Sequence, residues 1–566
     1  MTTEAATALP EALERLGAAL RDAELELPVP GLDAARAARR ELVDQIEDYL
    51  LPRLRQMDAP LLMVVGGSTG AGKSTLVNSL VGADVSPAGV LRPTTRAPVL
   101  VCHPDDVAWF EGDRVLPGMS RTRGASPDAS GTYALELVPT VALPPGLALL
   151  DSPDIDSVVE ANRALSRQLL AAADAWLFVT TAARYADAVP WELLHAARDR
   201  GTALSLVLDR VAPEAAAEVE AHLRAMAAER GLEGTELLVV EEAELAGGRL
   251  PDETLAPVRA WLDGLAADAQ ARSGLVRRTL TGALDSLPRR AGVVLGVLAD
   301  QAAEAQALHD DAEQAYARGL EEVDEAVRSG ALLRGEVLAR WHDVVGTGDL
   351  MRALESRLGR LRDRLRSLVT GTPAAEAELR TAVESSVDAV VYAAADRAAE
   401  RAAAAWRGRP AGRALLEGTT RLDAASPQLL DRTRGEVRSW QGEVFNLVSQ
   451  EGAGKRSTAR IASLGVNGAG LVVMIAVFAH TGGLTGAEVA VAGGTTAVGQ
   501  RLLEALLGDQ AVRSLAAKAR EDLLARTRKL LELEADRYRA LLADTVSAPE
   551  RREQLEAAVR AVEQAR

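Results

Sequence analysis

A single lysine constrains this chain more than any other residue. The chain has 4 lysines against 60 arginines, and the only lysine among its first 454 residues is Lys73. Lys73 lies in the run Gly67-Ser68-Thr69-Gly70-Ala71-Gly72-Lys73-Ser74, which satisfies the G-x-x-x-x-G-K-[ST] pattern of a phosphate-binding loop. In such a loop backbone N–H groups wrap a polyphosphate, and a slim ammonium reaches the β- and γ-oxygens where a planar guanidinium is too wide. The run therefore predicts a nucleotide site.

The flanks of this run agree with the prediction. Leu61 to Val65 is a short apolar stretch typical of a buried strand, and Thr75 to Leu80 reads as the start of a helix. A strand, a glycine-rich loop and a helix N-terminus together form an anion site, because the helix dipole and free N–H groups point at the ligand. The predicted nucleotide-binding residues here are Gly67, Ser68, Thr69, Gly70, Ala71, Gly72, Lys73, Ser74 and Thr75.

Further apolar runs follow the loop and define the fold class. They cover residues 99–102, 147–151, 175–179, 203–208 and 237–240, and helical stretches separate most of them. Strands that alternate with helices favour a mainly parallel sheet with helices on both faces, and ligands bind at the carboxyl ends of such strands. We therefore predict an α/β phosphate-loop domain.

Two residues downstream of the loop complete a predicted magnesium site with Ser74. A proline-rich segment from Leu91 to Pro98 contains adjacent threonines, and we favour Thr95 over Thr94 as the one that closes over Mg²⁺ and the γ-phosphate. Asp151 ends an apolar strand, where an acid that holds Mg²⁺ through water belongs. The predicted metal set is Ser74, Thr95 and Asp151.

The order of these motifs resembles the GTPase domain of the dynamin superfamily and its relatives among the Era-like GTPases. The resemblance is carried by Val64 to Asn78, by Arg92-Pro93-Thr94-Thr95-Arg96 and by Asp151-Ser152-Pro153-Asp154-Ile155-Asp156-Ser157. It covers residues 58–265, and the rest of the chain is more loosely similar to bacterial dynamin-like proteins. The resemblance implies a GTPase that uses Mg²⁺ and GTP rather than ATP.

Three positions depart from the pattern of that family. Asp154 replaces the glycine of D-x-x-G, so an acid lies beside the γ-phosphate position. The guanine-reading motif would be Asp209-Arg210-Val211-Ala212, which keeps Asp209 and Arg210 as candidate nucleotide-binding residues but lacks the base-pairing carboxylate. Thr69 takes the place where many dynamins carry a water-orienting glutamine. The candidate catalytic set is therefore Lys73, Thr95 and Thr69.

Composition limits the class of partner and the cellular compartment of this protein. The net charge of −17 argues against free nucleic acid as a partner. One cysteine, Cys102, excludes an internal disulfide, fits a reducing compartment and lies in an apolar strand, where we expect a buried thiol. The first residues lack the basic and apolar regions of a secretory signal, so we expect the nucleotide-binding part on the cytoplasmic side.

Outside residues 58–265 the pattern is helical. Residues 1–57 carry apolar side chains at helical spacing, such as Leu13, Leu16 and Leu20, and we expect them to pack with later helices. Residues 266–460 predict a neck and stalk, with a heptad-like leucine stripe at Leu354, Leu358, Leu361, Leu365 and Leu368. Residues 508–566 predict C-terminal stalk helices. Glycine-containing breaks, including Gly408 to Gly412, indicate helices that turn back on each other.

An apolar island at 461–507 is the second informative feature. Ile461 to Ala487 contains no Lys, Arg, Asp or Glu, and a second apolar stretch continues to Leu507. Basic residues flank both ends, which suits a hairpin that enters a bilayer from the cytoplasmic face. The alternative is a Gly/Ala-rich hairpin buried in the helical bundle or in a dimer contact. We favour a membrane-associating hairpin.

Together these features predict a dynamin-like GTPase at the cytoplasmic face of a bacterial cell membrane, with membrane lipids and either self-assembly or a related dynamin-like partner. It would couple nucleotide state to membrane binding and remodelling. One alternative is an Era-like regulatory switch that recruits a partner to the membrane. Another is a degenerate nucleotide sensor with weak hydrolysis or weak base specificity, which Asp154 and Ala212 favour.

Overall fold

The computed structural model describes residues 3–87, 98–112, 115–116, 119–123, 134–154, 160–329, 373–417, 419, 421–452, 509–545 and 549–566. The chain divides into two compact units. The first comprises Met1–Leu25, Pro30–Ala299 and Ser547–Arg566, and the second comprises Glu26–Val29 and Asp300–Val546. Both units are therefore discontinuous in sequence.

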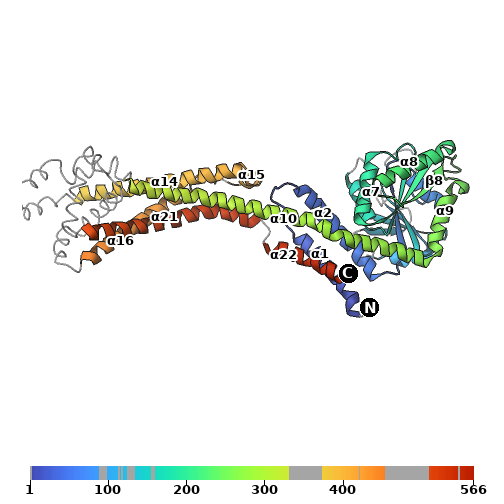
Figure 1. The fold of residues 1–566 in the computed structure, drawn as a ribbon, viewed down its shortest axis with the longest axis horizontal. Coiled ribbons are helices and arrows are strands. Elements are labelled where there is room, and N and C mark those ends of the chain that lie inside the picture. The colour runs from blue at the N-terminus through green and yellow to red at the C-terminus, as the bar shows by residue number, and fades with distance from the viewer. Residues whose placement is uncertain are drawn as a thin grey trace, which may run out of the picture. The chain divides into compact units, whose positions relative to one another are not determined.

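The first unit is built on an eight-stranded sheet (Figure 1). Its order is β3-β4-β2-β5-β1-β6-β7-β8, and every neighbouring pair is parallel except β2 and β5. The strands are β1 (Leu61–Gly67), β2 (Val99–Cys102), β3 (Ser120–Arg123), β4 (Ala134–Pro139), β5 (Leu147–Asp151), β6 (Ala175–Thr181), β7 (Ala203–Val211) and β8 (Glu236–Glu241). The mainly parallel sheet that the sequence predicts is confirmed.

Helices accompany this sheet. They are α1 (Thr3–Asp22), α2 (Leu32–Gln45), η1 (Ile46–Leu50), α3 (Leu51–Arg55), α4 (Lys73–Val81), η2 (Pro104–Asp106), α5 (Val107–Phe110), α6 (Glu160–Ala171), α7 (Ala188–Arg200), η3 (Pro213–Ala215), α8 (Ala216–Glu229), α9 (Asp252–Ala267) and α22 (Pro549–Ala565). The 60-residue helix α10 (Ala269–Arg328) contributes its residues up to Ala299 to this unit.

The central strands are apolar because both faces of the sheet are covered. Every residue of β1, β5 and β6 is buried, as expected for strands in the middle of a parallel sheet. Val64, Leu150, Trp176 and Phe178 lie in the core of this unit. Cys102 is also fully buried, which confirms the expected core thiol, and burial raises its pKa to about 11.

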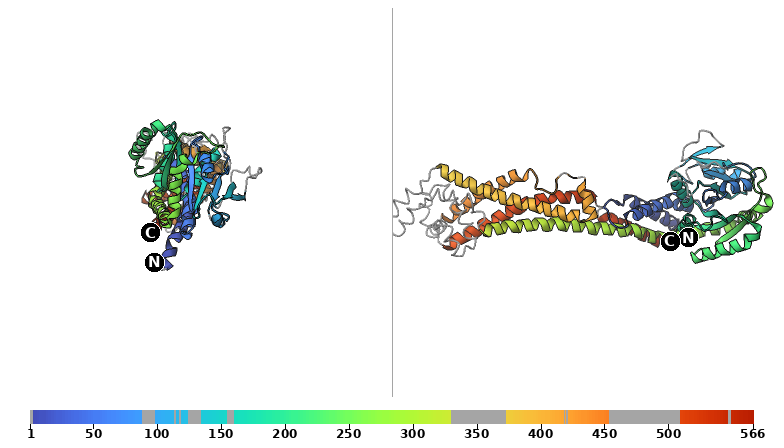
Figure 2. Two further views of the ribbon diagram at one scale, coloured as in Figure 1. Left: turned by 90° about the vertical axis from the view of Figure 1, so that its right-hand side faces the viewer. Right: turned by 90° about the horizontal axis from the view of Figure 1, so that it is seen from above.

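The first and last described helices of the chain pack on each other in this unit. α1 buries Leu13, Leu16 and Leu20, and α22 buries Leu555 and Val562. Figures 1 and 2 show the blue helix α1 beside the red helix α22. The early apolar spacing thus lies against a helix from the far end of the sequence.

The second unit is helical. Residues Asp300 to Arg328 of α10 lie alongside α14 (Pro373–Arg407), α15 (Pro410–Glu417), α16 (Leu429–Gly452) and α21 (Asp509–Thr545) (Figure 1). The break between α14 and α15 falls within the predicted Gly408 to Gly412 segment. The predicted large helical region is confirmed.

Tryptophans and a tyrosine join the helices of the second unit. Trp406 Nε1 donates to Leu308 O at 2.9 Å, and Trp440 Nε1 donates to Ala519 O at 2.8 Å. The Tyr538 hydroxyl lies 3.0 Å from Ala399 O and 2.8 Å from Leu422 O. Because these polar tips are buried with partners, each aromatic ring fixes its helix against a neighbour.

Several predictions fall outside the described residues. They are Thr95, the leucine stripe from Leu354 to Leu368 and the apolar island at 461–507. Among the helices that the structure does describe, none is both long and apolar enough to cross a membrane. The domain boundaries remain predictions.

Candidate functional site: a phosphate loop at the end of β1

The predicted phosphate loop connects β1 to α4. β1 ends at Gly67 and α4 begins at Lys73, with Gly72 in a left-handed conformation just before the helix. A Cβ atom on Gly67 would lie 2.2 Å from Val179 O, and one on Gly72 would lie 2.5 Å from Asp209 Oδ2. Both positions have a positive φ as well, so only glycine fits them. The loop therefore passes close to the ends of β6 and β7.

Lys73 is held inside this loop. Its side chain is 5% exposed, and its Nζ donates to Gly67 O at 2.8 Å and to Ser68 O at 3.2 Å. It also forms an ion pair with Asp154 Oδ1 at 2.5 Å. An ammonium has three N–H donors, so these three oxygens match its full capacity.

Ser74 and Asp151 form the next contact. Ser74 Oγ donates to Asp151 Oδ2 at 2.6 Å, and Ser86 Oγ donates to the same oxygen at 2.6 Å. Asp151 is fully buried, and burial raises its pKa, while the two hydroxyl groups and the Lys73 charge act in the opposite direction. Asp151 Oδ1 has no hydrogen-bond partner among the residues that the structure describes. A buried carboxylate oxygen without a donor is a candidate for an ordered water or a cation.

The donor set fits magnesium. Within the described ranges, no three His, Cys, Asp or Glu side chains gather as a metal cluster. Mg²⁺ needs no such cluster, because it is bound by one or two carboxylates together with phosphate oxygens and water. The Ser74 hydroxyl and the Asp151 carboxylate supply the protein oxygens that this arrangement requires.

Asp209 and Arg210 approach the same loop from β7. Arg210 donates to Gly70 O and has a left-handed backbone with a φ of 55°. The pairing of β7 with β8 shifts register between Leu208 and Val211, so a bulge turns this segment toward the loop. Asp209 is 7% exposed, and burial raises its pKa to about 6 despite the Arg210 charge.

The structure thus gathers the predicted site residues that it describes. Gly67 to Thr75 form the loop and the first turn of α4, and Asp151, Asp209 and Arg210 lie at the carboxyl ends of β5 and β7. Thr75 O accepts a hydrogen bond from Ser79 Oγ inside α4. The roles assigned to these residues remain predictions.

Residues 63–208 match the model of the dynamin family. This segment is thus similar to the GTPase domain of the dynamin family.

Other comparisons are weaker. No curated protein matches the sequence. Two solved structures of an oligomerised bacterial dynamin pair, a pair linked to long-range sensing and tethering of membranes, are each 10% identical and align over 93% of this chain and 95% of theirs, with a TM-score of 0.38. A structure of Era with MgGDPNP and a 16S ribosomal RNA segment is 18% identical over 36% of this chain and 57% of that chain, with a TM-score of 0.24. These scores are low, so the assignment rests on the family match.

Sequence reasoning missed two contacts of the GTPase domain. Ser86 bonds to Asp151 because Asn78 Oδ1 accepts from the backbone N–H groups of Val85 and Ser86 at 2.9 and 2.8 Å and so fixes the turn after α4. Arg184 follows β6 and donates to Thr69 O at 2.6 Å. The position of Arg184 just after a parallel strand is the one signal that points to it.

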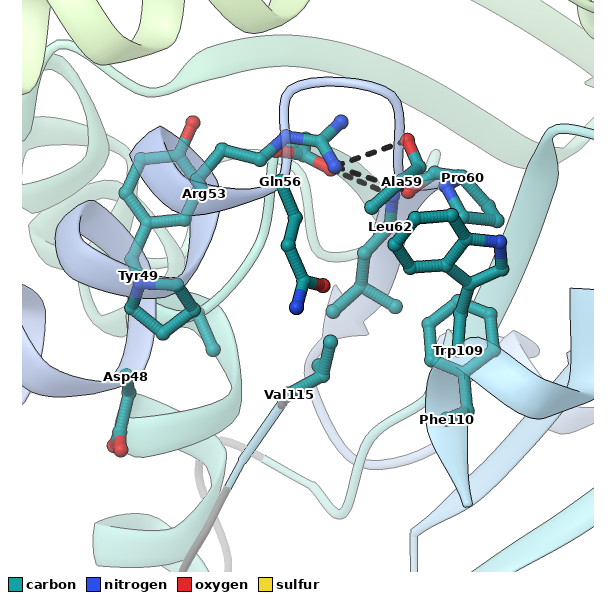
Figure 3. A pocket seen from close by; sticks show the side chains of 13 residues that line it. Asp48, Tyr49, Arg53, Gln56, Ala59, Pro60, Leu62, Trp109, Phe110 and Val115 are labelled. Carbon is teal, nitrogen blue, oxygen red and sulfur yellow. Dashed lines mark hydrogen bonds and ion pairs between the residues drawn. The ribbon is translucent and has the colours of Figure 1, made fainter. Parts of the chain in front are cut away.

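The GTPase domain also has a cavity at the opposite ends of the strands (Figure 3). It lies between α3, the start of β1, α5 and the residues before β6, and its lining includes Trp109 and Phe110. Arg53 and Asp174 form an ion pair there at 3.0 Å, with side chains 7% and 3% exposed. Arg53 also donates to Ala59 O at 3.0 Å, as Figure 3 shows. These contacts fix α3 to the amino edge of the sheet.

Proposed function

We propose that this chain is a membrane-associated dynamin-like GTPase of a bacterium that binds Mg²⁺ and GTP and couples nucleotide state to membrane binding and remodelling. The observation that carries the proposal is the buried Lys73 ammonium, set in a complete phosphate loop beside the bonded pair of Ser74 and Asp151. The match to the dynamin family over residues 63–208 supports guanine nucleotide as the ligand.

The chain's own residues would act mainly by position and charge. The loop N–H groups and the start of α4 stabilise phosphate negative charge, and Lys73 adds a compact positive charge at the β- and γ-oxygens. Ser74, Thr95 and Asp151 would hold Mg²⁺, with Asp151 acting through water. Bound Mg²⁺ neutralises charge on the phosphate oxygens during transfer. Thr69 and Thr95 complete the proposed catalytic set.

Arg210 has a positioning role in this proposal. Its side chain bridges β7 to Gly70 O, so the end of β7 is tied to the phosphate loop. The Asp209 side chain lies next to Gly72, so it also joins the end of β7 to the phosphate loop. Ala212 has no group that could hydrogen-bond a guanine edge, so the preference for GTP over ATP rests on the family match.

The membrane part of the proposal rests on sequence. The uncharged stretch 461–487 and its basic flanks favour contact with lipid at the cytoplasmic face, and the family favours self-assembly or a related dynamin-like partner. The same acidic chain is a poor candidate for binding nucleic acid.

Nucleotide binding is tested by calorimetry on the full chain with Mg²⁺ and GTP. The wild type should bind, and Lys73→Ala should lose binding because its removal takes away the buried charge. Binding that persists in Lys73→Ala would disprove the site assignment.

Membrane coupling is tested by flotation of the full chain with vesicles that contain anionic lipid. The wild type should float, and the double variant Val473→Asp with Ile475→Asp should stay at the bottom while keeping its GTP affinity. Equal flotation of both proteins would contradict the membrane proposal without affecting the nucleotide site.

A nucleotide sensor with slow turnover and weak base specificity is the second candidate. It is favoured by the Asp154 carboxylate on Lys73 and by the absence of a base-reading carboxylate at Ala212. Equal affinities for GTP and ATP would support it over the first candidate.

A further inference from the structure

Asp154 contacts the lysine of the proposed nucleotide site, and its role as inferred here rests on that proposed function. Of the three oxygens that contact Lys73 Nζ within the described residues, two are backbone carbonyls of the loop itself, at Gly67 and Ser68. The third, Asp154 Oδ1, belongs to a side chain and carries negative charge. A lysine in this loop serves the β- and γ-phosphate oxygens. A phosphate oxygen therefore needs a place on Nζ that Asp154 already takes.

The backbone that carries Asp154 is anchored. Ser152 Oγ donates to Val65 O at 2.9 Å, and Pro153 O accepts from Ser166 Oγ of α6 at 2.8 Å. These bonds tie the two residues before Asp154 to β1 and to α6. The Asp154 side chain itself is 20% exposed, against 5% for Lys73. The carboxylate thus lies at the edge of the site, while the backbone that carries it is held in place. A change of side-chain rotamer is then enough to separate it from Lys73.

Carboxylate and phosphate oxygens cannot share this ammonium freely. Each carries negative charge, and two anions within a few ångströms repel each other in a poorly solvated site. We propose that Asp154 is a tethered anion that competes with the terminal phosphate of the nucleotide for Lys73, and that it thereby sets the relative affinity for nucleoside triphosphate and diphosphate. A triphosphate must displace the carboxylate before its last phosphate contacts Nζ, whereas a diphosphate presents one phosphate fewer to it.

Asp154 is therefore a specificity-determining residue for the number of phosphates. Removing the side chain, as in Asp154→Gly, leaves Lys73 Nζ with its two described carbonyl partners and one donor for the ligand, and Asp154→Asn replaces the charged acceptor by a weaker neutral one. A hydrogen bond between charged groups is worth about 1.5–3 kcal/mol, which corresponds to roughly a tenfold to hundredfold change in affinity.

The test compares full-length wild type, Asp154→Asn and Asp154→Gly, where glycine is the residue of the D-x-x-G pattern. Affinities are measured by calorimetry at fixed Mg²⁺ for GDP and for the non-hydrolysable triphosphate analogue guanosine 5′-(βγ-imido)triphosphate. We expect both variants to bind the analogue at least about tenfold more tightly, with a smaller change for GDP. Asp84→Asn removes the same charge from an exposed carboxylate paired with Arg249 and should change neither affinity.

A second measurement reports on Lys73 directly. Without nucleotide, Asp154→Asn should melt at a lower temperature than wild type, because the buried Lys73 ammonium loses the carboxylate with which it forms an ion pair. The triphosphate analogue should then raise the melting temperature of the variant more than that of the wild type. Asp154→Gly serves the same comparison if the asparagine variant folds poorly.

The outcomes separate this inference from the proposed function. If wild type binds nucleotide through Lys73 but the ratio of triphosphate to diphosphate affinity is unchanged in both Asp154 variants, the competition is disproved and the site stands. Weaker triphosphate binding in both variants would overturn the inference too, because Asp154 would then assist the ligand. Absence of any nucleotide binding to wild type would instead overturn the proposed function.

Discussion

Asp151, Asp174 and Asp209 are buried carboxylates at the two ends of the central strands. Different partners offset the cost of burying the charge of each one. Two serine hydroxyl groups bond to Asp151, whereas Asp174 has Arg53 and the Leu62 N–H group as partners. Asp209 has Arg210, whose side chain is 48% exposed. Burial raises the pKa of all three carboxyl groups. Asp209 therefore retains a desolvation cost at neutral pH that its solvent-exposed partner offsets only in part.

Because of this desolvation cost, we predict that Asp209→Asn stabilises the folded protein and that the gain in stability depends on pH. The folded pKa of about 6 lies above the ordinary 3.8, so the penalty is present in full above pH 6 and is relieved as pH falls toward 4. The variant should be more stable than wild type at pH 7.5 by up to about 3 kcal/mol, and the gain should shrink at pH 5. Urea unfolding of both proteins at both pH values measures it. A gain that is equal at the two pH values would show that the charge is not its source.

At the scale of elements, α10 is fixed to the sheet over one helical turn. Thr279 Oγ1 donates to Asp174 O at 2.8 Å and accepts from the Ala203 N–H group at 3.1 Å. One turn later, Gly282 meets the end of α7, where Gly201 has a φ of 72°. A Cβ atom on Gly282 would lie 2.7 Å from Gly201 Cα, so the two backbones are in direct contact.

We predict that Gly282→Ala destabilises the GTPase domain by about 1–3 kcal/mol, because the methyl group overlaps backbone that cannot move aside easily. Gly292→Ala, in the same helix, adds a methyl group with no described atom within 4 Å, and it should instead stabilise by up to about 1 kcal/mol through helix propensity. Denaturant midpoints of the two variants provide the comparison. Stabilisation by both would rule out close packing at Gly282.

A second element-scale prediction concerns α3. Arg53→Ala leaves the Asp174 carboxylate buried without its counter-charge, and the loss of stability should be about 3–5 kcal/mol. The double variant Arg53→Met with Asp174→Asn removes both charges, and it should lose less stability than Arg53→Ala alone. Urea unfolding of the single variants Arg53→Met and Asp174→Asn completes a double-mutant cycle that measures the coupling. Strictly additive losses would mean that the two side chains do not interact.

Element prediction from sequence succeeded where one local property decided the structure. The six strands expected from apolar runs are present, since a strand covered on both faces must be apolar throughout. The apolar runs did not predict β3, because Ser120-Arg121-Thr122-Arg123 is an edge strand without such a run. They did not predict β4 either, because its alternation of apolar and polar residues is brief. Likewise, the loop residues follow from their motif, whereas Ser86 and Arg184 reach the site only through the folding of distant segments. No short-range pattern reveals the contact of Ser86, and the only signal for Arg184 is its position just after a strand.

At the scale of the whole molecule, the two units have separate hydrophobic cores. The GTPase domain encloses residues such as Trp176 and Phe178, and the helical unit encloses Trp406, Trp440 and Tyr538. Ligand bound to one folded unit stabilises that unit by mass action. The nucleotide should therefore act on one unfolding transition and not on the other.

We predict that calorimetric melting of the full chain shows this selectivity. Mg²⁺ and GTP at about a hundred times the dissociation constant should stabilise the GTPase domain by about 2.7 kcal/mol and raise its transition by several degrees. The transition of the helical unit should stay in place, and Lys73→Ala should abolish the shift. A parallel rise of every transition would indicate that the two units unfold as one.

The pairing of α1 with α22 has a consequence for how the protein is made. These helices flank almost the entire sequence, so a ribosome must synthesise residues 23–548 between them before the pair can form. The sheet lies wholly within Leu61–Glu241, so its strands emerge long before α22 does. During that interval α1, which buries Leu13, Leu16 and Leu20 in the folded protein, lacks the helix it packs on, and exposed apolar side chains of a nascent chain attract chaperones. Closure of this helix pair is then a late event in biosynthesis.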